Sequence, residues 1–366
     1  MHVVSSSDIC LSVTSSPEHS RPKVYWISLD VPGSVARRNL MQSQLGTLGL
    51  PNQRIEAIFP SSPKFNITKL VKPCKRNTEK DLAVILSHLT AIYTAVNDKV
   101  STLPESSLSS EYALITEDDV QFQFDIDYNK LVKSVPDKDF GILQLITSNI
   151  EGINRLWNIF SSGNGLWSNN TWDTLTKDRK AVLFWSAQAY IINKRTVRPF
   201  IEDVVTKWYN ETSQSWELSF QIIDSFDRNG CRRTKKYPCI LANCLFSDSY
   251  IYAGGGPTYI LNFPLFNGHA VGLNSSLHQE QVEVDGGHKD AFAAIQKIID
   301  QLKSNTYDSK LPEFIKIPEC HQNENNVVPE NQQYHRRHPH GHGGKLRLHH
   351  HGKVQLHAAT KYLDLK

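Results

Sequence analysis

The 366-residue chain has no long apolar stretch, few cysteines and little net charge, and each of these absences excludes a class of protein. Without about 18 consecutive apolar residues, no membrane-spanning helix is predicted. Six cysteines are too few for a disulfide framework in a chain of this length, and none forms a C-x2-C pair of the kind that holds zinc. The net charge of +3 includes +6 from residues 335–366, so the rest of the chain carries −3. A nucleic-acid-binding face on the body is therefore not expected.

The first 22 residues also lack the features of a secretion signal. They contain acidic residues, no basic N-terminal region and no long apolar core. This favours a cytoplasmic location. We also expect residues 1–22 to form a disordered N-terminal segment. A secretory lumen is the alternative, because the sequence contains Asn-x-Ser/Thr sequons that would be glycosylated only there. These sequons begin at Asn66, Asn169, Asn210 and Asn274.

Apolar spacing predicts strands that alternate with helices. Short runs rich in β-branched and aromatic residues predict strands at 24–29, 112–116, 140–145 and 187–192. Apolar residues at 3.6-residue spacing predict helices at 37–50, 79–96, 195–208 and about 288–303. This alternation predicts an α/β domain over residues 23–318, with an open, mostly parallel sheet and helices on both faces.

Residues 319–366 form a polar C-terminal tail with nine of the 15 histidines, eight of them from His335 onward. Such a composition cannot bury a core, so we expect the tail to be disordered. Histidine tracts bind transition metals loosely, and a protein whose main activity lies in this tail is one alternative. That alternative leaves the organisation of the body unexplained.

Three consecutive carboxylates, Glu117, Asp118 and Asp119, follow the predicted strand 112–116. Adjacent carboxylates repel one another unless they are solvated or offset by a cation. Ligands of open α/β sheets bind at the carboxyl ends of strands, so the position favours a metal and nucleotide site. Oxygen ligands suit Mg²⁺ or Mn²⁺, which complete their coordination with water and substrate phosphates. A solvated acidic turn is the alternative interpretation.

The order and spacing of five segments resemble glycosyltransferase family 25, which includes bacterial lipooligosaccharide galactosyltransferases and collagen galactosyltransferases. The segments are VYWISLDVPGSVARRNLMQSQL, RIEAI, EKDLAVILSHLTAIYTAV, YALITEDDVQF and AQAYIINKRTVRPFI. The resemblance covers about residues 23–270. Its most specific parts are LSHL at 86–89 and EDDV at 117–120.

This resemblance implies a GT-A-like fold and a metal-dependent enzyme of glycan biosynthesis. Such an enzyme transfers a hexose, most commonly galactose, from a UDP-sugar to a hydroxyl of a glycan, a lipid-linked glycan or a protein, with inversion. Carried over to this chain, Asp119 is the direct ligand of Mn²⁺ or Mg²⁺. Glu117 assists through water or the donor ribose, and Asp118 lies on the donor side.

Arg38 and His88 are the other candidates for contact with the donor. Arg38, and with less support Arg37, follows the first strand and can pair with phosphates through its guanidinium group. The alternative is that both arginines only solvate the start of a helix. His88 lies off the apolar stripe of its helix, and it either faces the donor or hydrogen-bonds at a seam between helix and sheet.

An inverting displacement also needs a carboxylate base to take the proton of the acceptor hydroxyl. YPCILANCLFSDSYIY resembles a family segment with an Ala-Asp pair, but this chain has Asn243 in place of the aspartate, and an amide cannot act as the base. We favour Asp248 for this role, with Asp224 and Asp227 as alternatives. Asn243 also motivates a second hypothesis, in which the protein binds a nucleotide sugar or glycan without turnover.

Residues 150–181 are rich in Gly, Asn and Ser, and they contain Trp157, Trp167 and Trp172. We interpret this segment as a lid or an acceptor-binding segment, because tryptophan rings stack on the C–H faces of sugars. Core filling is the competing role for each of these tryptophans.

Overall fold

The computed structural model describes residues 21–60, 79–98, 108–170, 184–220, 247–268, 282–304 and 311–316. The chain divides into two units, Met1–Cys320 and His321–Lys366, and every described residue belongs to the first. The predicted disordered segments 1–22 and 319–366 fall outside the described residues, apart from Arg21 and Pro22. Those two predictions stay predictions.

The centre of the first unit is a seven-stranded sheet with the order β2-β1-β3-β8-β6-β11-β7. In this order the strands are Asn52–Glu56, Lys23–Ser28, Tyr112–Glu117, Ala189–Asn193, Ile142–Gln144, Thr258–Leu261 and Trp167–Asn169. Five of the seven strands run in the same direction, and β8 and β7 run opposite to them. β8 is antiparallel because its chain enters the sheet where β3 ends, with the Glu117 amide donating to the Gln188 carbonyl at 2.9 Å. The sheet is therefore mixed, with most strands parallel in direction.

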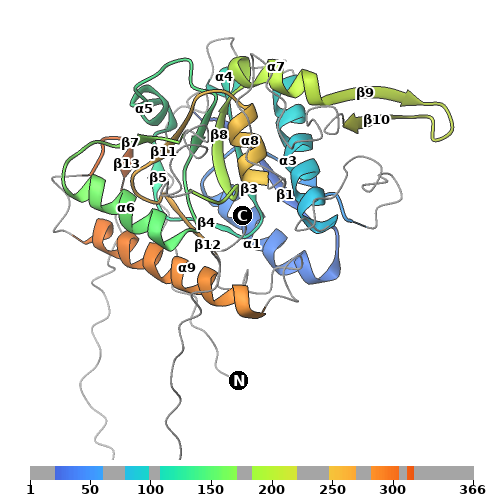
Figure 1. Ribbon diagram of the computed structural model, residues 1–366. Coiled ribbons are helices and arrows are strands. Elements are labelled where there is room, and N and C mark those ends of the chain that lie inside the picture. Colours follow the sequence, from blue (N-terminus) through green and yellow to red (C-terminus); the bar gives the residue numbers. More distant parts are fainter. Residues whose placement is uncertain are drawn as a thin grey trace, which may run out of the picture. The chain divides into compact units, whose positions relative to one another are not determined.

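Helices cover both faces of this sheet, as the sequence predicted (Figure 1). One face packs against α3 (Glu79–Asn97), α7 (Lys194–Val204) and α8 (Ser247–Gly254). The other face packs against α1 (Val35–Thr47), α5 (Tyr128–Lys133) and α9 (Val282–Lys303), with α6 (Ile150–Ser161) beside α9. The alternating side chains of β1 are buried on both faces. Tyr25 and Ile27 pack into the core on the α3 side, and Val24 and Trp26 pack into the core on the α1 side.

Shorter elements complete the described part. They are η2 (Pro32–Ser34), α4 (Leu108–Glu111), β4 (Val120–Phe122), β5 (Asp125–Ile126), β12 (Phe266–Gly268) and β13 (Ile315–Lys316). β4 pairs with β12 and β5 with β13, so these pairs extend the domain beyond the main sheet. Within the described ranges, no helix has the length and apolar content that a membrane span requires.

The predicted helix 195–208 is wrong at its C-terminal end, because α7 stops at Val204 and the chain continues into a hairpin. The hairpin consists of β9 (Val205–Asn210) and β10 (Ser215–Phe220) and projects from the body in Figure 1. The β-branched and aromatic residues from Val205 to Tyr209 favour a strand. The Asn210 side chain then closes the turn by accepting from the amides of Thr212 and Ser213.

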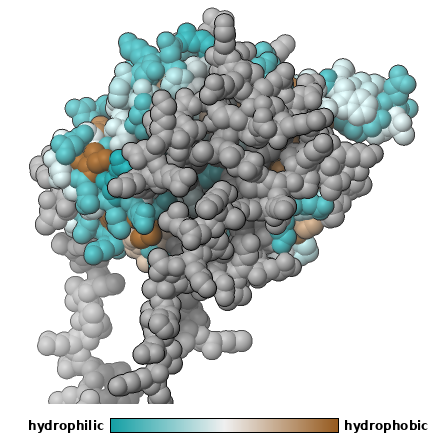
Figure 2. Space-filling model, in the orientation of Figure 1, coloured by the Kyte–Doolittle hydropathy of each residue, from teal (hydrophilic) through white to brown (hydrophobic). Residues whose placement is uncertain are grey.

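Exposed aromatic side chains mark the surface of this hairpin. They are Trp208, Tyr209 and Trp216. In Figure 2 the described part of the visible face is mostly hydrophilic, and the projecting hairpin shows both pale and hydrophilic residues. The hairpin therefore presents aromatic side chains to solvent.

Candidate functional site

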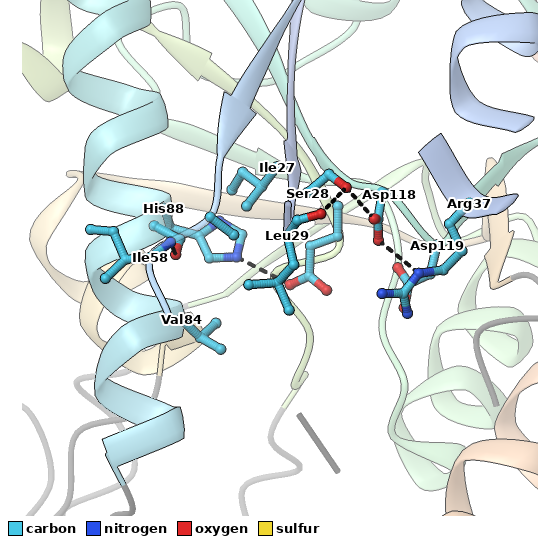
Figure 3. Close-up of a pocket in the computed structure, with 12 residues that line it drawn as sticks. Ile27, Ser28, Leu29, Arg37, Ile58, Val84, His88, Asp118 and Asp119 are labelled. Atoms are coloured by element: carbon cyan, nitrogen blue, oxygen red, sulfur yellow. Dashed lines mark hydrogen bonds and ion pairs between the residues drawn. The ribbon is translucent and has the colours of Figure 1, made fainter. Parts of the chain in front are cut away.

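The three acidic residues lie at the carboxyl edge of the sheet, beside a pocket of about 520 Å³ that includes open solvent. Ile27 and Ser28 at the end of β1 form one part of its wall. His88 of α3, Arg37 of α1 and the three acidic residues form much of the rest (Figure 3).

Asp118 points into the protein and is held by partners from two other elements. The Ser28 hydroxyl donates to its Oδ2 at 2.5 Å, and the Arg37 Nε lies 3.3 Å from its Oδ1. Burial raises the pKa of Asp118, while the Arg37 charge and the Ser28 hydrogen bond act in the opposite direction. Since both carboxylate oxygens have protein partners, Asp118 links β3 to β1 and α1 at the base of the pocket.

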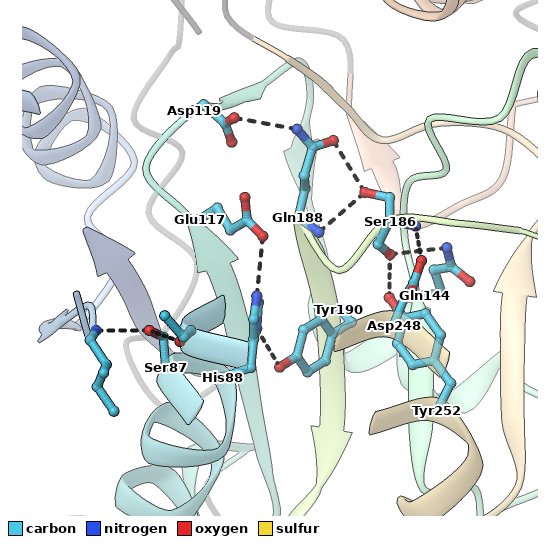
Figure 4. A network of polar contacts seen from close by, with 12 residues as sticks. Ser87, His88, Glu117, Asp119, Gln144, Ser186, Gln188, Tyr190, Asp248 and Tyr252 are labelled. Carbon is cyan, nitrogen blue, oxygen red and sulfur yellow. Dashed lines mark hydrogen bonds and ion pairs between the residues drawn. The ribbon is translucent and has the colours of Figure 1, made fainter. Parts of the chain in front are cut away.

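Glu117 remains partly exposed and is oriented by a buried histidine. Its Oε1 lies 3.1 Å from the Nε2 of His88, whose side chain is only 1% exposed. The Nδ1 of His88 lies 3.0 Å from the hydroxyl of Tyr190 on β8 (Figure 4). Burial raises the pKa of Tyr190 well above its usual range, so this hydroxyl stays protonated and can donate. His88 thus lines the pocket and also bonds across the seam between helix and sheet.

Asp119 offers the least satisfied oxygen of the three carboxylates. Its Oδ2 accepts a long hydrogen bond of 3.5 Å from the Nε2 of Gln188. Its Oδ1 is buried and has no hydrogen-bond partner among the described residues. Burial, followed by the charges of Glu117 and Asp118, raises the pKa of Asp119 to about 7. A buried carboxylate oxygen with these neighbours suits a cation.

The donor set therefore fits a hard divalent cation that takes only part of its coordination from the protein. Glu117 and Asp119 supply carboxylate oxygens at the pocket wall. Across the described ranges, no group of three or more His, Cys, Asp or Glu side chains is arranged to hold a metal. Mg²⁺ and Mn²⁺ fit such an incomplete site, because they keep several waters and bind substrate phosphates.

Of the two neighbouring arginines, Arg37 lines the described pocket wall and Arg38 does not. The Nη1 of Arg38 donates to the carbonyls of Leu29 at 2.5 Å and Val31 at 3.3 Å, which shapes the loop after β1. The sequence analysis favoured Arg38 over Arg37 for contact with the donor phosphates. The signal for Arg37 was helical spacing, since Arg37 shares its buried face with Met41, four residues later.

Only one of the base candidates lies within the described residues. Asp248 is in the first turn of α8, and its Oδ2 accepts from the Ser186 amide at 3.2 Å. Asp248 therefore lies beside Ser186, two positions before Gln188, whose side chain contacts Asp119 (Figure 4). Asp248 is not part of the described pocket wall. Asp224, Asp227 and Asn243 lie outside the described residues.

The tryptophans singled out from the sequence are mostly involved in packing. Trp157 lies against Phe160, and the Trp167 indole donates to Ser134 at 3.0 Å, while both contact the core from partly buried positions. Trp172 lies outside the described residues. Sequence reasoning missed Trp185, which is 53% exposed and comes just before Ser186 at the same edge of the sheet.

Sequence reasoning also missed Ser28, Gln188 and Tyr190. Gln188 and Tyr190 are two positions apart, so they share a face of the extended chain around β8. That periodicity was readable in AQAYII, but their partners Asp119 and His88 lie far away in the sequence.

A sequence profile described as glycosyltransferase family 25 (LPS biosynthesis protein) matches residues 21–216. This range includes every residue that lines the pocket described above. No curated protein matches the chain.

Proposed function

The chain belongs to glycosyltransferase family 25 and is a glycosyltransferase, and we propose that it is a metal-dependent hexosyltransferase. In this proposal it transfers galactose from a UDP-sugar to a hydroxyl of a glycan, a lipid-linked glycan or a protein, with inversion. The observation that carries the proposal is the buried, unpartnered Asp119 Oδ1 beside Glu117 in the described wall of the pocket.

Glu117 and Asp119 would hold Mn²⁺ or Mg²⁺, and the bound ion would neutralise charge on the diphosphate leaving group. His88 keeps the Glu117 carboxylate at the pocket by a contact of 3.1 Å. Arg37 contributes a fixed positive charge to the same wall. The apolar side chains of Ile58 and Val84 line another part of the pocket and suit the flat face of a nucleoside base.

We assign Asp248 as the base of the transfer. In the inverting step, the acceptor oxygen bonds to the anomeric carbon while the bond from that carbon to the diphosphate oxygen breaks. The acceptor proton passes to the Asp248 carboxylate. The Ser186 amide orients that carboxylate by donating to Oδ2. A base needs this kind of fixed orientation before its pKa matters.

The test of this function is a donor screen with the purified full chain. Release of the nucleotide product is measured with UDP-, GDP- and CMP-sugars, in the presence of Mn²⁺ or of EDTA. We expect turnover with UDP-galactose that EDTA abolishes. Turnover that EDTA leaves unchanged would refute the metal dependence. Turnover with GDP- or CMP-sugars alone would refute a UDP-sugar as the donor. Binding of UDP-galactose without release would support the non-catalytic alternative.

Trp185 is the exposed aromatic residue that we assign to the acceptor. Its backbone is held by hydrogen bonds from Ser148 at 2.9 Å and Thr147 at 2.8 Å, so an exposed ring is presented from a fixed point. Trp185→Ala should raise the acceptor KM about 5–10-fold, since stacking on an aromatic ring contributes about 1 kcal/mol.

The control for this prediction is Trp216→Ala, which removes an exposed tryptophan from the projecting hairpin. Initial rates at varied acceptor concentration should show a wild-type KM for that variant. Equal effects of the two substitutions would remove the assignment of Trp185 to the acceptor.

A further inference from the structure

We infer that Gln188 is a positioning residue that sets the Asp119 carboxylate for its cation, and that Ser186 in turn sets Gln188. The inference rests on the metal-dependent function proposed above. It concerns residues that act through Asp119, outside the set of groups that bind the ion. Figure 4 shows Gln188 between Asp119 and Ser186.

The two ends of the Gln188 amide have different partners, and this fixes its orientation. Nε2 donates to Asp119 Oδ2 at 3.5 Å, and Oε1 accepts from the Ser186 hydroxyl at 3.2 Å. A flipped amide would place an oxygen against the carboxylate and an NH₂ group against the hydroxyl donor. With Oδ2 engaged in this way, Oδ1 is the carboxylate oxygen left for the ion.

Ser186 is itself held in an unusual backbone conformation. Its φ is 134°, in a region that residues with a Cβ rarely adopt. Asp248 accepts from its amide, and its carbonyl accepts from the Tyr252 hydroxyl at 2.5 Å and from Gln144 Nε2 at 3.2 Å. A strained backbone of this kind persists where several contacts with neighbouring groups hold the residue in place. Such residues are concentrated at functional sites.

These contacts place the serine hydroxyl against the side-chain Oε1 and the backbone N–H of Gln188. Besides donating to Oε1, it accepts from the backbone amide of Gln188 at 3.2 Å. The path therefore runs from the clamped backbone of Ser186, through the oriented amide of Gln188, to Asp119. Groups that orient a ligand in this way typically contribute about 10-fold or more to metal affinity.

The experiment is a titration of the metal-free full chain with Mn²⁺ in the presence of UDP, with free Mn²⁺ followed by electron paramagnetic resonance. Gln188→Leu should weaken Mn²⁺ binding about 10-fold. Gln188→Asn, which keeps an amide on a shorter side chain, should weaken it in the same direction. The matched control is Gln53→Leu, a partly buried glutamine of β2 that accepts a hydrogen bond from Lys23. It should leave the Mn²⁺ affinity unchanged.

A double variant tests the order of the path. If Ser186 acts through Gln188, Ser186→Ala should weaken Mn²⁺ binding by itself and add nothing to Gln188→Leu. A merely structural role would instead lower the melting temperatures of the metal-free variants without this pattern in Mn²⁺ affinity. Wild-type affinity in Gln188→Leu and Gln188→Asn would overturn the inference and leave the proposed function intact. Absence of Mn²⁺ binding by the wild-type chain would overturn both.

Discussion

Asp119→Asn is expected to lower kcat/KM of the sugar transfer by about 100-fold or more. The asparagine keeps the size of the side chain but removes the charge from the oxygen that has no partner among the described residues. Loss of a cation that stabilises the leaving group removes several kcal/mol of transition-state stabilisation, which gives an effect of at least about this size. The measurement is the rate of UDP release at saturating and limiting donor, together with Mn²⁺ affinity.

The same substitution should stabilise the metal-free protein at neutral and alkaline pH. The folded-state pKa of Asp119 is raised to about 7 from an ordinary value of 3.8, so ionisation of Asp119 disfavours the folded state. This penalty is absent below the unfolded pKa, grows between the two values and is complete above the folded pKa. Asp119→Asn removes the penalty. In EDTA at about pH 8 we expect a gain of about 2 kcal/mol in the free energy of unfolding, since part of the side chain is exposed.

The pH dependence distinguishes this explanation from a general effect of the substitution. The gain should disappear at about pH 3, where Asp119 is protonated in both the folded and the unfolded wild-type protein. The matched control is Asp290→Asn on the exposed surface of α9, which should change neither activity nor stability. A destabilised Asp119→Asn variant at alkaline pH, or one with full activity, would contradict the role assigned to Asp119.

The fold was predictable where one local pattern decides the structure. β1, β3 and β8 are buried on both faces and appear as unbroken apolar runs, and the buried residues of α3 follow 3.6-residue spacing. The antiparallel direction of β8 was not predictable, because it depends on which edge of the sheet the chain enters. The end of α7 was missed although the β-branched and aromatic side chains of residues 205–209 favour a strand.

The location of the candidate site was predictable, but the division of roles within it was not. Glu117, Asp118 and Asp119 are identical in kind from the sequence, and their order indicates only an acidic strand end. Their differences come from partners that the fold brings near: Ser28 and Arg37 engage Asp118, His88 orients Glu117, and Gln188 contacts Asp119. The choice between Arg37 and Arg38 likewise depends on the rotation of α1 about its axis.

Arg37→Met should produce the largest loss of stability among the substitutions considered. The side chains of Arg37 and Asp118 are only 7% and 9% exposed, with Nε and Oδ1 at 3.3 Å. Removing one member of a buried ion pair leaves the other charge uncompensated, which typically costs about 3–5 kcal/mol. The free energy of unfolding is measured by urea denaturation near neutral pH, followed by tryptophan fluorescence.

Three comparisons separate this buried pair from ordinary surface charge. Arg54→Met breaks the exposed pair between Arg54 and Asp30, so we expect a loss below about 1 kcal/mol. In Arg37→Met, adding Asp118→Asn should restore much of the stability, because the stranded charge is gone while Ser28 can still donate to the amide oxygen. Burial already raises the pKa of Asp118, and loss of the Arg37 charge raises it further. The destabilisation should therefore shrink as the pH falls and Asp118 becomes protonated. A loss that is independent of pH and unrelieved by Asp118→Asn would show that Arg37 stabilises the fold by packing alone.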